Sequence, residues 1–212
     1  MQGLVHIVDD DPSFLTAMER HLKHAGYEVA VYASAQALLD RLPSDSVPSC
    51  ILLDVRIPGI DGPALQKRLN ELGSTLPIIF VSGHVDIPLT VRALKEGAED
   101  FLTKPVTSDG LLTAIERAFA RHRGFREQQS RLDVVRALIA KLTPRERQVF
   151  ELIVAGKTNK QIGSILGTTE RTIKAHRQQV MEKMQVRTLA ELVAVAERVG
   201  VIGDKPNSGP MA

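Results

Sequence analysis

Apolar residues in the first 120 positions of the chain follow two alternating patterns. Short runs rich in Val and Ile predict buried strands at Leu4–Val8, Val29–Tyr32, Cys50–Asp54, Pro77–Ser82 and Asp100–Leu102. Between these runs, apolar residues recur at helical spacing, as in Leu111, Ile115 and Phe119. Five strand–helix repeats predict an α/β domain over residues 1–121, a doubly wound parallel sheet of order 2-1-3-4-5 with helices on both faces.

The pattern changes after Thr143, where strands vanish and helix starts recur. Thr143, Thr158 and Thr188 are each followed three residues later by Glu or Gln, which predicts capping boxes, and Thr169 caps a further helix. The helices predicted at Asn159–Leu166 and Glu170–Met184 are separated by a tight Gly-Thr-Thr turn, the helix-turn-helix arrangement. Residues 142–203 are therefore predicted to form an all-α domain of four helices.

A nearly continuous helix is predicted over Asp109–Lys141. Positions spaced alternately by four and three residues give it a heptad rhythm: Leu111, Ile115, Ala118, His122, Phe125, Gln129, Leu132, Arg136 and Ile139. Three of these nine positions are polar, and Gly124 weakens the middle of the segment. We therefore predict a linker helix over 122–141, with a paired coiled coil as the alternative. Residues 204–212 lack periodicity and are predicted to be a disordered tail.

Composition narrows the class of protein. The 212 residues are 43% hydrophobic and 25% charged, as in ordinary soluble globular proteins. The sequence has neither a run long enough to span a membrane nor a signal-peptide pattern, so we expect a cytoplasmic protein with no membrane partner. The single cysteine, Cys50, excludes an intramolecular disulfide and a Cys-based zinc site. The absence of Trp and the 4% aromatic content disfavour a stacking platform for single-stranded nucleic acid.

The net charge of +2 conceals an asymmetry between the two halves of the chain. Residues 1–120 contain 10 basic and 16 acidic residues, whereas residues 121–212 contain 17 basic and 9 acidic residues. An acidic half joined to a basic half indicates that only the second half meets a polyanion such as nucleic acid.

Carboxylates gather at one predicted edge of the sheet. Asp9, Asp10 and Asp11 follow the first strand, and Asp54 ends the third, which is its neighbour in the order 2-1-3-4-5. Like charges this close repel unless a cation lies between them, and a site with oxygen ligands alone favours Mg²⁺. Ser82 ends the fourth strand, and Lys104 follows the fifth. A carboxylate, a metal site, a hydroxyl and an ammonium are what transient phosphorylation of an aspartate requires.

The motifs Asp9-Asp10, Leu53-Asp54, Ser82-Gly83 and Lys104-Pro105 resemble the receiver domain of bacterial two-component response regulators. The likeness covers residues 4 to about 120, including the loop 56–62 and the run 95–101. It implies that Asp54 accepts a phosphoryl group, that Asp10 binds Mg²⁺ and that Asp9 supports the ion through water. It also implies that Arg56 contributes its backbone carbonyl to the metal. Ser82 and Lys104 would bind phosphoryl oxygens, and Phe101 would turn inward with Ser82 on activation. His84 is a candidate for tuning the acyl-phosphate lifetime or a solvent-exposed loop residue.

The helix over 170–184 has an apolar and a polar face. Ile173, Val180 and Met184 share the face expected to pack inward. The opposite face carries the residues predicted to read bases in the DNA major groove: Arg171, Lys174, Ala175 and Gln178. Phosphate contacts are predicted for Lys157, Asn159 and Lys160, while Arg177 and His176 suit either phosphate contact or packing.

The segments 142–147, 156–162 and 172–176 resemble the LuxR-type output domain, so the whole chain resembles the FixJ/NarL family of response regulators. Gly163, Ile173 and Thr168 depart mildly from that pattern. The resemblance implies a Mg²⁺-dependent regulator that a sensor histidine kinase phosphorylates. It also implies a homodimer formed on phosphorylation, binding to double-stranded DNA, and action on RNA polymerase, as an activator.

Two other functions compete with this interpretation. A phosphatase of the haloacid-dehalogenase type also uses an Asp nucleophile after a strand. Its mechanism needs a second Asp two residues on, where this chain has Arg56, so we predict that the protein is not an enzyme. Alternatively, the helical domain binds only protein, or RNA; an interaction independent of salt would favour protein.

Overall fold

A computed structural model describes residues 3–42, 47–83 and 87–201 of the chain. The candidate lifetime residue His84 and the predicted tail 204–212 lie outside these described residues. The chain divides into two compact units, Met1–Glu127 and Gln128–Ala212. The division falls inside the predicted linker helix over 122–141. Within the described part of the chain, no helix combines the length and the apolar character that a membrane span requires.

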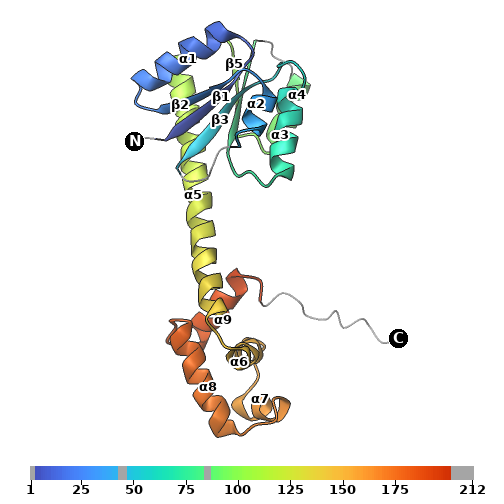
Figure 1. Cartoon of the computed structure of the whole chain (residues 1–212), viewed down its shortest axis with the longest axis vertical. Coiled ribbons are helices and arrows are strands. Elements are labelled where there is room, and N and C mark those ends of the chain that lie inside the picture. The colour runs from blue at the N-terminus through green and yellow to red at the C-terminus, as the bar shows by residue number, and fades with distance from the viewer. Residues whose placement is uncertain (1–2, 43–46, 84–86, 202–212) are drawn as a thin grey trace, which may run out of the picture. The chain divides into compact units, whose positions relative to one another are not determined.

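The first unit is built on a five-stranded sheet of order β2-β1-β3-β4-β5, as predicted (Figure 1). Its strands are β1 (Leu4–Val8), β2 (Glu28–Tyr32), β3 (Ser49–Asp54), β4 (Ile78–Ser82) and β5 (Asp100–Thr103). All the pairings are parallel, and Asp54 lies opposite Val81 while Ser82 lies opposite Thr103. The carboxyl ends of the strands therefore meet at one edge of the sheet.

Helices cover both faces of this sheet (Figure 1). They are α1 (Pro12–His24), α2 (Ala35–Leu39), α3 (Gly62–Glu71), α4 (Ile87–Lys95) and the first part of α5 (Ser108–Ala140). One apolar cluster joins α1 and α5 to residues such as Val5 and Ile7, and the other joins α2, α3 and α4 to residues such as Ile51 and Leu53. Adjacent residues of a strand point to opposite faces, so β1 and β3 supply both clusters. Strands buried on both faces account for the nearly continuous apolar runs in the sequence.

Helix α5 contributes to both units. Leu111 and Ile115 of the heptad stripe are buried in the first unit and Ile139 in the second, whereas Phe125 in the middle of the stripe is 39% exposed. The two ends of the helix thus pack into separate cores. The polar His122 on this stripe is 0% exposed, and its Nδ1 accepts a hydrogen bond from the backbone N–H of Ser49 at 2.9 Å. A buried polar group of this kind is tolerated because it is hydrogen-bonded.

The second unit is helical and contains α6 (Pro144–Val154), α7 (Asn159–Ile165), α8 (Glu170–Lys183) and α9 (Leu189–Arg198). Capping boxes are present at Thr143 and Thr158, as predicted. At the third predicted box, Thr188 accepts from the backbone of Glu191, and the Glu191 carboxylate accepts from the backbone N–H of Arg187 at 2.9 Å. The core of the unit is apolar and fully buried: Val149, Phe150, Ile162, Ile173, Val180, Met184 and Leu192.

Candidate functional site

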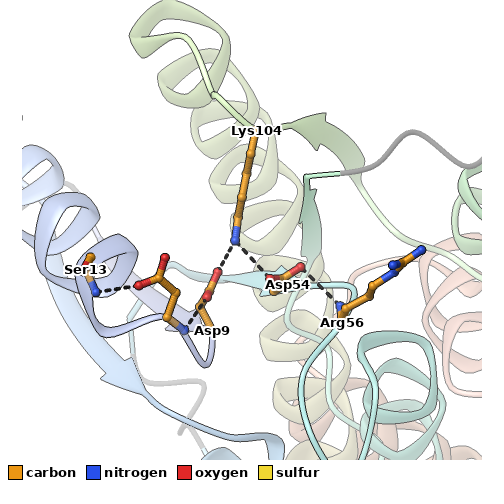
Figure 2. Close-up of polar contacts among 6 residues, drawn as sticks. Asp9, Ser13, Asp54, Arg56 and Lys104 are labelled. Carbon is orange, nitrogen blue, oxygen red and sulfur yellow. Dashed lines mark hydrogen bonds and ion pairs between the residues drawn. The ribbon is translucent and has the colours of Figure 1, made fainter.

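The candidate site lies at the carboxyl edge of the sheet, where β1, β3, β4 and β5 end. Asp9 follows β1, Asp54 ends β3, and Lys104 follows β5. Figure 2 shows the Lys104 side chain reaching between the two carboxylates. Its Nζ donates to Asp9 Oδ2 at 2.6 Å and to Asp54 Oδ2 at 3.0 Å. Residues separated by 95 and 50 positions in the chain are thus brought together, as the predicted strand order required.

The three consecutive aspartates have three different environments. Asp9 is 1% exposed, and its Oδ1 accepts from the backbone N–H of Asp11 at 2.9 Å. Asp10 is exposed. Asp11 is the N-cap of α1, because its side chain accepts from the backbone N–H of Ser13 at 2.8 Å. Asp11 therefore has a structural task, and Asp9 and Asp10 are the two that face the site.

The loop after β3 is tied to Asp54 and packed tightly below it. The backbone N–H of Arg56 donates to Asp54 Oδ1 at 3.2 Å, and the Arg56 side chain is exposed (Figure 2). Gly62 begins α3 directly under this loop, where a Cβ would lie 2.6 Å from the carbonyl oxygen of Asp54. A residue without a side chain is required for so close an approach.

The electrostatics of the site leave a deficit of positive charge. Burial raises the pKa of the Asp9 carboxyl, although the hydrogen bonds from Lys104 and Asp11 oppose this rise. Burial disfavours the charged form of Lys104, but the hydrogen bonds to Asp9 and Asp54 outweigh it and raise the pKa of Lys104. The ammonium therefore stays charged, yet it does not fully compensate the buried carboxylate. A second cation would be stabilised here.

The donor set fits a hard divalent cation. Asp9, Asp10 and Asp54 each offer a carboxylate oxygen, and these oxygens all lie within 4.8 Å of one another. Oxygen ligands from one or two carboxylates are typical of Mg²⁺ sites that also bind phosphate. The predicted ligand Arg56 lies at the same edge through its bond to Asp54.

The two remaining residues of the predicted switch lie on β4 and β5. Ser82 is buried, and its carbonyl oxygen accepts from the backbone N–H of Lys104 at 2.7 Å. Phe101 is half-buried, and its ring centroid lies 6.3 Å from that of Phe80. The ends of β4 and β5 are thus joined directly beside the carboxylates.

The second unit carries the candidate nucleic-acid interface on α8. The predicted base-reading residues Arg171, Lys174, Ala175 and Gln178 are all exposed, while Ile173 and Val180 on the other face are buried. Lys157 and Lys160 are also exposed. Arg177 is half-buried, and its Nη1 donates to Asn159 Oδ1 at 3.3 Å, which links α8 to the start of α7.

Two contacts near these sites were missed in the sequence. Phe14 of α1 places its ring centroid 4.0 Å from the Nζ of Lys104. Arg145 donates to the carbonyl oxygen of Leu166 at 2.6 Å and so satisfies the end of α7. Periodicity assigns both residues to helices, but it gives no signal for partners so distant in the chain.

Comparison with known proteins defines the class. Residues 5–116 match the family described as response regulator receiver domain, and residues 140–196 match bacterial regulatory proteins of the luxR family. The chain belongs to the response regulators that join a receiver domain to a LuxR-type helix-turn-helix domain.

Its similarity to individual relatives extends over nearly the whole chain. It is 41% identical over 200 residues to nodulation protein W of Bradyrhizobium diazoefficiens, covering 94% of this chain and 88% of the relative. It is 40% identical over 203 residues to the transcriptional regulatory protein FixJ of the same organism, covering 96% and 98%. A low-resolution structure of the response regulator StyR matches with a TM-score of 0.80 and 39% identity, covering 92% and 98%.

These comparisons confirm the family resemblance, the fold class and the general function. The protein is a phosphorylation-controlled transcriptional regulator of a two-component system. Its receiver domain implies a histidine kinase as partner, and its LuxR-type domain implies DNA binding.

Proposed function

We propose that Asp54 is the phosphoryl acceptor and that its modification, with Mg²⁺ bound at the carboxylate cluster, controls DNA binding. The observation that carries this proposal is the Lys104 ammonium shared between Asp9 and Asp54, at 2.6 and 3.0 Å, beside the exposed Asp10. Asp54 is only partly buried, so a phosphoryl donor can reach it. The adjacent Lys104 ammonium can then hold the phosphoryl group.

The residues at the sheet edge divide the chemistry among themselves. An Asp54 carboxylate oxygen attacks phosphorus, and the bond from phosphorus to the donor's histidine nitrogen breaks, with the electron pair returning to that nitrogen. Asp9, Asp10, Asp54 and the Arg56 carbonyl would hold Mg²⁺, which neutralises phosphoryl charge when bound. The Lys104 ammonium would then donate to a phosphoryl oxygen, and the Ser82 hydroxyl would donate to a second phosphoryl oxygen.

The switch proposed here is a shift between two arrangements of Ser82 and Phe101. Ser82 lies at the end of β4, and Phe101 is only half-buried against Phe80, so inward rotation of the ring buries more apolar surface. A phosphoryl group that binds Ser82 better in one arrangement shifts the population toward it.

The helical domain is proposed to read DNA through the exposed face of α8. Arg171, Lys174, Ala175 and Gln178 reach base edges, while Lys157, Asn159, Lys160 and Arg177 serve the phosphates. We further propose that the phosphorylated protein dimerises on paired half-sites and activates RNA polymerase. It would do so in the cytoplasm, where both the DNA and the polymerase are found.

The proposed domains follow one another along the chain. Residues 1–121 form the phosphoacceptor domain, 122–141 the linker helix, and 142–203 the DNA-binding domain. The exposed Arg56 stands where a haloacid-dehalogenase-type phosphatase needs an acidic proton donor, which supports a regulator without enzymatic turnover.

The direct test is incubation with acetyl phosphate and Mg²⁺, followed by intact mass measurement. We expect the wild type to gain one phosphoryl group and Asp54→Asn to gain none. Asp40→Asn, an exposed carboxylate at the end of α2, is the matched control and should be modified like the wild type. Unchanged mass in the wild type, or modification of Asp54→Asn, would refute the assignment.

A further inference from the structure

An aromatic ring faces the ammonium group of Lys104. The Nζ of Lys104 lies 4.0 Å from the ring centroid of Phe14, while it also donates to Asp9 and Asp54. Phe14 lies in the first turn of α1 and packs against the apolar cluster that α1 and α5 form with the sheet. A cation within about 6 Å of a ring face is attracted by the negative charge of the ring's π-system. The ammonium therefore has three anchors, and one of them carries no net charge.

We infer that Phe14 is a positioning residue for phosphoryl transfer, whose ring holds the Lys104 ammonium beside Asp54 through a cation–π interaction. This inference rests on the proposed phosphorylation of Asp54. Phe14 is assigned no contact with Asp54 or with the incoming phosphoryl group, and it acts through Lys104.

The ring matters because the other two anchors are the proposed metal ligands. A divalent cation at Asp9 and Asp54 takes up much of their negative charge and so weakens their attraction for the ammonium. An aromatic ring is no ligand for a hard cation that prefers oxygen, so its attraction for Lys104 persists. The Lys104 side chain is 22% exposed, and rotation of the ammonium toward water is the competing state. Because the ring attracts the ammonium, it disfavours rotation toward water and keeps the ammonium beside Asp54, where the phosphoryl group binds.

A purely structural role for Phe14 makes a different prediction. Phe14 also fills space in the apolar cluster, so truncating it would disturb packing whatever its effect on Lys104. Fluorination separates the two roles, because it withdraws electron density from the ring face with little change in ring shape.

The experiment replaces Phe14 in the full chain with mono-, di- and trifluorophenylalanine. The first readout is the rate of Asp54 phosphorylation by acetyl phosphate with Mg²⁺. The second is the rate at which an amine-acylating reagent labels Lys104 in the metal-free protein, followed by peptide mass spectrometry. We expect the phosphorylation rate to fall stepwise, by about two- to fivefold for the trifluoro ring, and labelling to rise in the same order. Phe14→Trp, with the stronger ring, should retain the wild-type values.

Met18→Leu is the matched control, because Met18 lies one helical turn further along α1 and packs against the same cluster. It should leave both rates unchanged, and the melting temperature of every variant reports packing. Phe14→Leu, which removes the ring, is measured beside them. Fluorinated proteins equal to the wild type in both readouts would overturn the inference, even if Phe14→Leu loses phosphorylation rate. A wild type that takes up no phosphoryl group refutes the proposed function and the transfer role together. The labelling result still decides whether the ring holds the ammonium.

Discussion

At the scale of single residues, Asp9 is held charged in surroundings that disfavour its charge. Burial raises the pKa of the Asp9 carboxyl despite the ammonium of Lys104 beside it. The folded protein therefore binds this proton more tightly than the unfolded chain does. Asp9 favours folding below its unfolded pKa of about 3.9, and that contribution is lost as the pH rises through the folded pKa. The ionised residue costs stability at neutral pH, which is typical of functional sites.

Asp9→Asn should accordingly stabilise the metal-free protein. Asn keeps an acceptor for the backbone N–H of Asp11 but carries no charge, and Lys104 keeps Asp54 as its ion-pair partner, so we expect the free energy of unfolding at pH 7 to rise by up to about 1 kcal/mol. The gain should be smaller at pH 4 than at pH 7, because the raised pKa makes the wild-type carboxyl take up its proton more readily as the pH falls. Urea unfolding at both pH values measures it, with Asp40→Asn as the control. Addition of Mg²⁺ should stabilise the wild type and not Asp9→Asn; a variant less stable than the wild type at pH 7 would contradict the argument.

At the scale of the element, Gly163 in helix α7 lies so close to the following turn that a side chain would not fit. A Cβ on Gly163 would lie 2.9 Å from the carbonyl oxygen of Thr168, in the turn that leads into α8. The departure of Gly163 from the pattern of the LuxR-type domain is thus matched by a close approach of α7 to the turn. Gly124 in α5 is the opposite case, since a Cβ there would meet nothing within 4 Å.

These two glycines give opposite predictions for the same substitution. Gly163→Ala gains helix propensity of about 1 kcal/mol but forces backbone atoms apart, so we expect a net loss of about 1–2 kcal/mol in stability. Gly124→Ala gains the propensity without the clash and should stabilise by up to about 1 kcal/mol. Thermal unfolding compares the stability of the two variants with that of the wild type. A Gly163→Ala variant more stable than the wild type would show that the turn moves aside without loss of stability.

The two kinds of proposed DNA contact lie on different parts of the second unit, since Lys157 precedes α7 and Lys174 lies on α8. Lys157→Ala should weaken binding uniformly across DNA sequences and reduce the slope of log affinity against log salt by about one, because it removes one proposed phosphate contact. Lys174→Ala should cost about 1–3 kcal/mol on the preferred site and relax base preference at one position. Binding titrations over a range of salt on specific and random DNA measure both effects. Equal losses on the two DNAs for Lys174→Ala would exclude base reading by that residue.

Features that depend on interactions between residues close in the sequence could be predicted, whereas most contacts between packed elements could not. The strands and the long helix were predictable to within about one residue at most boundaries, because periodicity and caps such as Thr143 act locally. The order 2-1-3-4-5 was predictable as one of the common orders of doubly wound sheets. The meeting of Asp9, Asp54 and Lys104 was predictable because parallel strands end at one edge. The ring of Phe14 over Lys104, the bond from Arg177 to Asn159 and the need for Gly163 were not predictable. Each depends on how two packed elements approach, and spacing along one element carries no record of that.

At the scale of the whole molecule, phosphorylation at one unit must change the behaviour of another that carries its own core. Asp54 lies in the first unit and α8 in the second, and each unit has a separate apolar cluster. Within the second unit taken by itself, the face of α8 proposed to read bases is exposed, so no rearrangement inside that unit is needed to present it. What the modification can change is the number of DNA-binding domains that act together. Joining two of them turns the second binding event into an intramolecular one.

Two DNA duplexes, one with a single half-site and one with two, test whether phosphorylation acts by joining two DNA-binding domains. A duplex with one half-site should bind the phosphorylated protein and Asp54→Asn with equal affinity, because both present the same α8 surface. A duplex with two half-sites about 10 base pairs apart should bind the phosphorylated protein at least tenfold more tightly than it binds Asp54→Asn. Analytical ultracentrifugation should show a dimer only after phosphorylation, and a half-turn change in spacing should abolish the gain. A phosphorylation-dependent gain on the single half-site would instead mean that the unmodified receiver blocks α8, and the switch would then act by release rather than by assembly.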